Sequence, residues 1–137
     1  MKRVLSLVVA VVLTFSVLNV TWVYVIEPYE MQPNYIGVAT MKPGLTLNTG
    51  GLMTCTDNIE IKTGYTAKVV WSLQYQSNRN WISTQTWKDS NKKRMSLNKT
   101  VAVVSGRNYR LQTVATVYDA NGKVVETVTK VSESIRT

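Results

Sequence analysis

Residues 65–76, with the sequence YTAKVVWSLQYQ, decide the fold class of this chain. The odd-numbered positions are apolar or aromatic, while the even-numbered positions, apart from Val70, are polar or charged. Side chains of a β-strand point alternately to its two faces, so this pattern predicts a strand with one buried and one exposed face. Trp71 and Leu73 lie on the face that we expect to be buried.

Other alternating runs surround this strand and are separated by turn residues. We expect further strands at residues 45–49, 52–61, 81–87, 95–104, 108–118 and 123–131. Residues 77–80 are expected to form a hairpin loop, and Asn121-Gly122 tolerates the positive φ angles of a tight hairpin turn. About seven strands at this spacing predict an all-β fold, a single antiparallel β-sandwich.

A hydrophobic segment begins directly behind two cations at the N-terminus. Lys2 and Arg3 precede the apolar run 4–18, an order typical of a secretory signal. Continued to residue 26, the run is also long enough to cross a bilayer as a helix. We interpret residues 1–26 as a signal peptide or an uncleaved membrane-anchor helix. Both alternatives place the domain outside the cell, either secreted or on the extracellular face of the membrane.

The remaining boundaries follow from composition. Residues 27–44 contain all three prolines of the chain and show no periodicity. Proline lacks a backbone donor and forces extended conformations on its neighbour, so we expect a linker here. The β-sandwich domain then occupies residues 45–131, and residues 132–137 form a frayed tail.

Side-chain chemistry points away from catalysis. The chain has no histidine, so the commonest general base and the commonest zinc ligand are missing. The acidic residues are scattered, apart from Asp57 and Glu60, which we expect on a solvated strand edge. Cys55 is the one cysteine, and we expect either a small buried side chain or a link between chains. The sequence therefore predicts no enzyme, no cofactor and no metal site.

Positive charge is the main functional feature of the composition, with 16 Lys and Arg against eight Asp and Glu. It is densest at residues 88–94. If the loops meet at one end of the sandwich, the basic side chains would form a patch that attracts cell-wall polymers or other polyanions. The alternative is a solvated loop that keeps the domain soluble. The candidate polyanion-binding residues are Lys88, Lys92, Lys93, Arg94, Lys99, Arg107 and Arg110.

Two tryptophans stand six positions apart in the strand expected at residues 81–87. Regular alternation places Trp81 and Trp87 on the same face of that strand. If this face points outward, the two indoles form a platform that stacks on sugars or bases. If it points inward, they belong to the core beside Trp71.

The order of these features resembles that of immunoglobulin-like and fibronectin-type β-sandwiches. The resemblance covers roughly residues 52–131 and rests on Trp71 in a mid-sequence strand, on residues 106–111 and on the late Asn121-Gly122 hairpin. It implies that Tyr109 is the tyrosine corner, the side chain that ties down the turn before the penultimate strand. The cysteine pair of antibody domains is missing.

The hydrophobic leader, Cys55 before Asp57, the hairpin at residues 81–87 and Tyr109 are together also similar to small secreted proteins of Gram-positive bacteria that have no assigned function. The likeness implies an exported β protein. We therefore expect a non-catalytic secreted or cell-surface module with a binding or structural role. Its partner would be a cell-wall polymer, another polyanion or a surface protein, and we do not expect nucleic acid. The alternative is a cationic secreted effector, bacteriocin-like or membrane-active, that acts on anionic envelopes.

Overall fold

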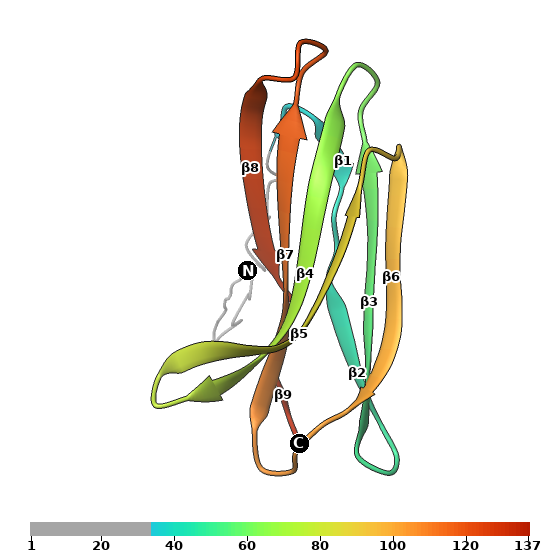
Figure 1. Cartoon of the computed structure of the whole chain (residues 1–137). Coiled ribbons are helices and arrows are strands. Elements are labelled where there is room, and N and C mark those ends of the chain that lie inside the picture. Colours follow the sequence, from blue (N-terminus) through green and yellow to red (C-terminus); the bar gives the residue numbers. More distant parts are fainter. Residues whose placement is uncertain (1–33) are drawn as a thin grey trace, which may run out of the picture. The chain divides into compact units, whose positions relative to one another are not determined.

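A computed structural model describes residues 34–137, and every regular element among them is a β-strand (Figure 1). The prediction of an all-β fold with antiparallel sheets is therefore confirmed for this part of the chain. The signal or anchor helix expected at residues 1–26 lies outside the described residues. Within residues 34–137 no helix has the length and apolar character needed to cross a membrane.

The first sheet is built around β3 (Leu52–Ile61). β6 (Arg94–Ala102) pairs antiparallel along one edge of β3. Two short strands share the other edge, because β2 (Gly44–Asn48) pairs with the first half of β3 and β1 (Val38–Thr40) pairs with its end.

The second sheet has β4 (Thr66–Ser77) and β7 (Asn108–Tyr118) at its centre. β5 (Asn80–Ser90) pairs with the outer edge of β4. β8 (Val124–Val131) and the short β9 (Ile135–Arg136) both pair with the far edge of β7. The order across the sheet is thus β5, β4, β7 and β8.

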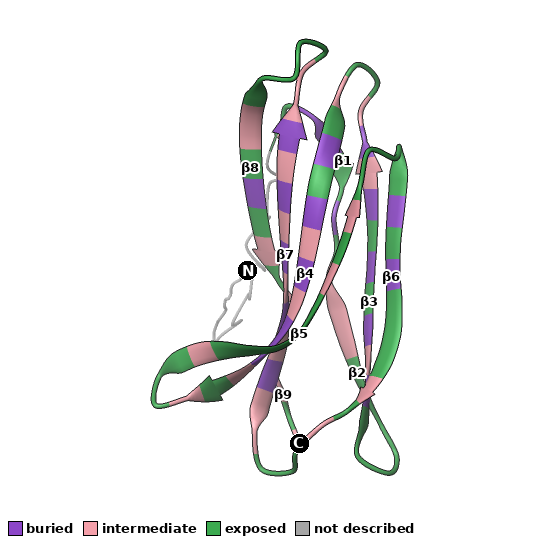
Figure 2. Ribbon diagram, in the orientation of Figure 1, coloured by how far each residue is buried: buried purple, intermediate pink, exposed green. Residues whose placement is uncertain are grey.

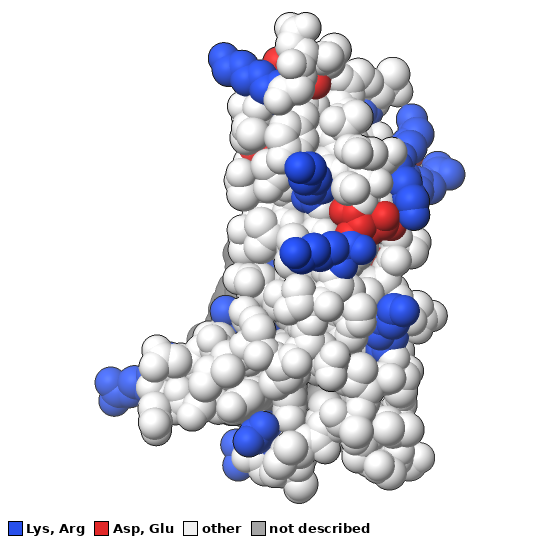
Figure 3. All heavy atoms as spheres, viewed as in Figure 1, with Lys and Arg blue, Asp and Glu red and all other residues white. Residues whose placement is uncertain are grey.

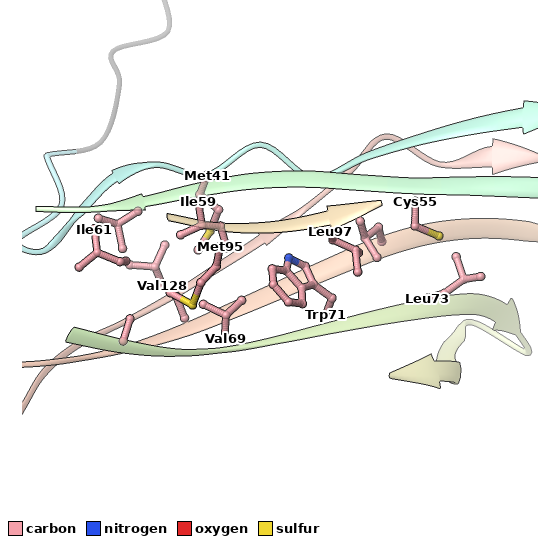
Figure 4. Close-up of a cluster of buried hydrophobic side chains, with 14 of the residues drawn as sticks. Met41, Cys55, Ile59, Ile61, Val69, Trp71, Leu73, Met95, Leu97 and Val128 are labelled. Atoms are coloured by element: carbon pink, nitrogen blue, oxygen red, sulfur yellow. The ribbon is translucent and has the colours of Figure 1, made fainter. Parts of the chain in front are cut away.

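The core lies between the two sheets, whose inner side chains point toward one another (Figure 4). Burial alternates along β3, β4 and β7 (Figure 2). The side chains expected in the core are enclosed: Trp71 is 2%, Leu73 1%, Tyr109 2% and Leu111 0% exposed. The predicted alternation of these strands is therefore confirmed.

Tyr109 lies at the start of β7 and holds the corner that precedes it. Its hydroxyl oxygen accepts a hydrogen bond from the backbone N–H of Val104 at 2.9 Å. The ring packs against Tyr75, with 6.2 Å between the ring centroids. A buried ring with a satisfied hydroxyl fixes the path of the chain from β6 into β7.

The linker expected at residues 27–44 is wrong for the part that the structure describes. Val38 and Met41 are 2% and 4% exposed and belong to the core, and β1 and β2 are paired strands. The Glu126 carboxylate accepts hydrogen bonds from the N–H groups of Ile36 and Gly37 at 2.8 and 3.0 Å. Pro43 falls between the two strands, where its missing N–H removes no ladder hydrogen bond.

The frayed tail expected at residues 132–137 is also wrong. β9 pairs with the first two residues of β7. The Thr137 hydroxyl donates to the carbonyl oxygen of Val104 at 2.7 Å, and its oxygen accepts from the N–H of Arg107 at 3.0 Å. The last residues therefore brace the same corner that Tyr109 holds from inside.

Candidate functional site

Of the six acidic residues among residues 34–137, two accept hydrogen bonds from backbone N–H groups alone and two form ion pairs. Asp119 accepts from two backbone N–H groups of its own turn, and Glu126 binds the backbone at residues 36 and 37. Asp89 and Glu60 form ion pairs with Lys92 and Arg94, at 3.2 and 3.4 Å. Each of these four carboxylates is thus held by a nearby backbone N–H group or cation.

Asp57 differs from these acidic residues because it is buried in the core, with 5% of its surface exposed. The solvated edge expected for it is therefore wrong. One carboxylate oxygen accepts from Trp71 Nε1 at 3.1 Å and from Thr113 Oγ1 at 2.7 Å. The other accepts from the N–H groups of Lys42 and Asn58 at 2.8 and 2.7 Å. Asp57 thus links β3 to β4 and β7 of the opposite sheet.

Cys55 is fully buried in the same strand as Asp57. Its burial raises the pKa of the thiol to about 11, because the thiolate would lose its hydration. A protonated thiol is a poor nucleophile and a poor metal ligand. Across residues 34–137, no three His, Cys, Asp or Glu side chains gather closely enough to hold a metal ion.

Basic side chains gather at one end of the domain, where β3 ends and β6 begins. The backbone N–H of Ile61 donates to the carbonyl of Lys93 at 2.8 Å, and that of Asn91 donates to Ala67 at 2.9 Å. These bonds bring the end of β3, the start of β4 and the loop between β5 and β6 together. We call this group the basic corner; it consists of Lys62, Lys68, Lys88, Lys92, Lys93 and Arg94.

Most of the charge of the basic corner has no acidic partner. Lys62 Nζ donates to the backbone oxygen of Tyr35 at 2.6 Å, and Lys93 Nζ donates to Thr63 Oγ1 at 3.4 Å. A hollow of about 230 Å³ lies between Lys62, Lys92 and Lys93. Lys92 and Arg94 have ion pairs, but their side chains are 63% and 73% exposed, so the pairs hold them weakly.

The single patch expected from seven basic residues is not formed. Lys88, Lys92, Lys93 and Arg94 belong to the basic corner. Arg107 directly precedes β7 and Arg110 is its third residue, so both lie at the other end of the domain. Lys99 lies along β6, opposite Cys55 of β3. Figure 3 accordingly shows Lys and Arg at several separate places, with the acidic atoms of this face confined to its upper half.

The hairpin of β4 and β5 projects sideways from the two sheets, and we call residues 74–83 the arm (Figure 1). The expectation that Trp81 and Trp87 share a face is wrong. The pairing of β4 with β5 skips Thr84, so a β-bulge shifts the alternation by one residue. Trp87 opposes Trp71 and packs against the core, while Trp81 opposes Gln76 on the outer face.

Trp81 forms a stack with an arginine from the far side of β4. The guanidinium carbon of Arg110 lies 4.3 Å from the centroid of the indole. Arg110 Nε donates to Gln74 Oε1 at 2.8 Å, and Gln74 Nε2 donates to Gln112 Oε1 at 3.2 Å. Gln74 is only 7% exposed although it lies on the outer face of the sheet. Partial burial lowers the pKa of Arg110 below its ordinary value.

The tip of the arm is a two-residue turn with positive φ at both positions, 50° for Asn78 and 70° for Arg79. Such turns match the twist of the strands, and glycine is the usual second residue. Arg79 therefore adopts a backbone conformation that is unfavourable for a long side chain. The sequence predicted the loop at residues 77–80 but not its positive φ angles. The lack of glycine in this short loop was the feature that could have indicated an unfavourable turn.

No protein-family model matches the chain, and no curated protein is significantly similar to it.

Proposed function

We propose that the protein is a non-catalytic module, secreted or held on the cell surface, that binds anionic polymers through the basic corner. The observation that carries the proposal is the uncompensated charge of this corner. Its six cations come from three separate segments, and only two of them have an acidic partner. Such a field attracts polyanions at long range and releases their counterions on contact.

The proposal includes the immunoglobulin-like or fibronectin-type layout. It is supported by the strand order, since a sheet of β1, β2, β3 and β6 faces one of β5, β4, β7 and β8. The hydrogen bond of Tyr109 to the preceding corner supports it further. Export is supported by the sequence pattern of residues 1–26, and a non-catalytic role by the lack of histidine.

The test is the binding of the full chain to anionic cell-wall polymers over a range of salt concentrations. The variant Lys92→Gln/Lys93→Gln/Arg94→Gln should bind roughly tenfold more weakly at low salt, with a shallower dependence of affinity on salt. A matched variant, Lys123→Gln/Lys130→Gln/Arg136→Gln, removes the same charge elsewhere and should change binding much less. Equal losses in the two triple variants would reject a site at the basic corner.

The second candidate, a membrane-active cationic effector, is favoured by one observation. Leu47, Leu52 and Val104 are large apolar side chains with 41%, 40% and 53% of their surface exposed. The β2–β3 turn and the chain after β6 lie side by side there, since Val103 N–H donates to the Gly51 carbonyl at 2.9 Å. Leakage of vesicles rich in anionic lipid distinguishes the two candidates, because a polymer-binding module leaves them sealed.

A further inference from the structure

A second cluster of polar side chains lies on the outer face of the sheet, where the arm joins β7. Its chemistry differs from that of the basic corner. Three neighbouring strands contribute to it in register, since Gln74 opposes both Ser83 and Arg110, and Gln76 opposes Trp81. Its side chains are one indole, one guanidinium, amides and a hydroxyl. We call this cluster the arm face; it consists of Gln74, Gln76, Trp81, Ser83, Arg110 and Gln112.

Arg110 is the only charged residue of the arm face, and it has no acidic partner among the described residues. Segments 72–87 and 104–112, which build the arm and its root, contain three arginines and no Asp or Glu. The guanidinium is held in one orientation by Trp81 and by the hydrogen bond to Gln74. A planar donor group that is oriented and partly desolvated favours bidentate contact with an oxyanion.

The neighbours of Arg110 are suited to hydroxyl groups. Amide side chains donate and accept hydrogen bonds at the same site, as sugar hydroxyls do. Gln112 and Ser83 both contact Gln74, and Asn108 Nδ2 donates to Gln76 Oε1 at 3.4 Å. Trp81 is half-buried, so part of its indole is available to a flat, weakly polar ring.

We propose that the arm face binds an acidic polysaccharide, with Arg110 contacting the carboxylate, sulfate or phosphate group and Trp81 packing against the sugar ring. This inference rests on the proposed function, binding of anionic polymers, and adds a site that recognises their saccharide part. The basic corner attracts charge without regard to the groups that carry it. The arm face distinguishes between anionic polymers, because it binds only those that carry a sugar ring beside the anionic group.

The test compares three probes that separate ring from charge. Oligogalacturonate carries carboxylates on sugar rings, heparin-derived oligosaccharide carries mainly sulfates, and inorganic polyphosphate carries charge without rings. Binding of the full chain is measured by calorimetry for the wild type and for Trp81→Leu, Arg110→Gln and Arg110→Lys. Lys123→Gln, at the turn between β7 and β8, is the matched control for the loss of one positive charge.

We expect Trp81→Leu to weaken binding of at least one of the two saccharide probes about tenfold and to leave polyphosphate binding within twofold. Arg110→Gln should weaken binding of the same probe about tenfold, more than Lys123→Gln does. Arg110→Lys keeps the charge but loses the planar fork, so a loss of about threefold should remain. Which saccharide responds identifies a carboxylate or a sulfate as the preferred group.

Two results would overturn the inference while the proposed function stands. In the first, Trp81→Leu and Arg110→Gln bind every probe as well as Lys123→Gln does. In the second, Trp81→Leu lowers polyphosphate and saccharide binding equally, which would show that no ring is recognised. If the wild type binds neither the three probes nor the anionic cell-wall polymers, both proposals fail. Thermal unfolding of each variant shows whether a loss arises from misfolding.

Discussion

The body of the domain around Asp57 and the projecting arm are built in opposite ways. In the body, the carboxylate of Asp57 receives four hydrogen bonds and joins the two sheets across a closed core. In the arm, β5 pairs only with β4, and Arg79 adopts a conformation that favours glycine. The body thus satisfies its polar groups internally, whereas the arm presents charge and an aromatic ring to solvent.

Stability and recognition are thus carried by different regions of the molecule. Buried polar groups stabilise a fold only when all their partners are present, so the body should tolerate little change. Apart from Gln74, no residue of the arm is buried, and its turn holds Arg79 in an unfavourable backbone conformation. Substitutions in the two regions should therefore have effects of different size and, at one position, of opposite sign.

The largest effect is expected for Asp57→Ala, which leaves the donors of Trp71, Thr113 and Lys42 without an acceptor in the core. We expect a loss of about 3–5 kcal/mol in the free energy of unfolding, measured by urea denaturation. Thr113→Val removes one of the four donors and should cost about 1 kcal/mol. If Asp57→Ala fails to fold, Thr113→Val still tests the contribution of this hydrogen-bond network. Wild-type stability for both variants would break the contrast between body and arm.

A second effect concerns pH and Cys55. Its thiol pKa is about 11 in the folded protein against 9.0 for the free group, so both states keep the proton below pH 9. Above pH 9 the unfolded chain loses the proton first, and folding stability falls by about 2–3 kcal/mol as the pH approaches 11. Cys55→Ala should lack this contribution, while the other titrating groups remain common to both proteins. Parallel stability curves from pH 8 to 11 would contradict the prediction.

Gly37→Ala tests how closely the body is packed. A Cβ at this position would lie 2.4 Å from Val117 Cγ1, a distance that forces side chains or backbone to move. We expect a loss of about 1–3 kcal/mol in chemical denaturation. In the double variant Gly37→Ala/Val117→Ala, the loss should be smaller than the sum of the single losses, because the clash is removed. Strict additivity would show that the clash is not the cause.

The smallest effect is expected in the arm and has the opposite sign. Arg79→Gly places glycine at a turn position with φ of 70°, and should stabilise the protein by about 0.5–1 kcal/mol. Asn78→Gly should change stability less, because asparagine already tolerates this region. Thermal unfolding monitored by circular dichroism measures both. A destabilised Arg79→Gly variant would show that the Arg79 side chain makes contacts that support the arm.

Strand formation could be predicted from the sequence because the pattern that specifies it is local. The alternation at residues 65–76 and 108–118 predicted which side chains of β4 and β7 are buried, and Trp71, Leu73 and Leu111 are enclosed. The likeness to immunoglobulin-like sandwiches pointed to Tyr109 at the corner, where its hydroxyl contacts Val104. The alternation is contained in each strand itself, whereas the role of Tyr109 came from the order of features over residues 52–131.

The candidate site was predicted less well because it depends on pairing between distant strands. The skipped residue at Thr84 moves Trp81 to the outer face, and no pattern within residues 81–87 indicates it. The separation of Arg107 and Arg110 from the basic corner depends likewise on the direction of β7. Asp57 was expected at the surface because its hydrogen-bond donors Trp71 and Thr113 are distant in the sequence, on β4 and β7.

The strands with one apolar face, the strong positive charge and the lack of histidine can all be read from the order of residues. Which residues meet cannot: that Asp57 joins the sheets, that residues 38–48 belong to the core domain and that Arg110 lies over Trp81 are properties of the folded chain. The two kinds of feature differ in how far apart in the chain their determinants lie. Alternation follows from the geometry of one strand, whereas bulges, buried polar links and charge clusters arise from the register between strands that lie far apart in the chain.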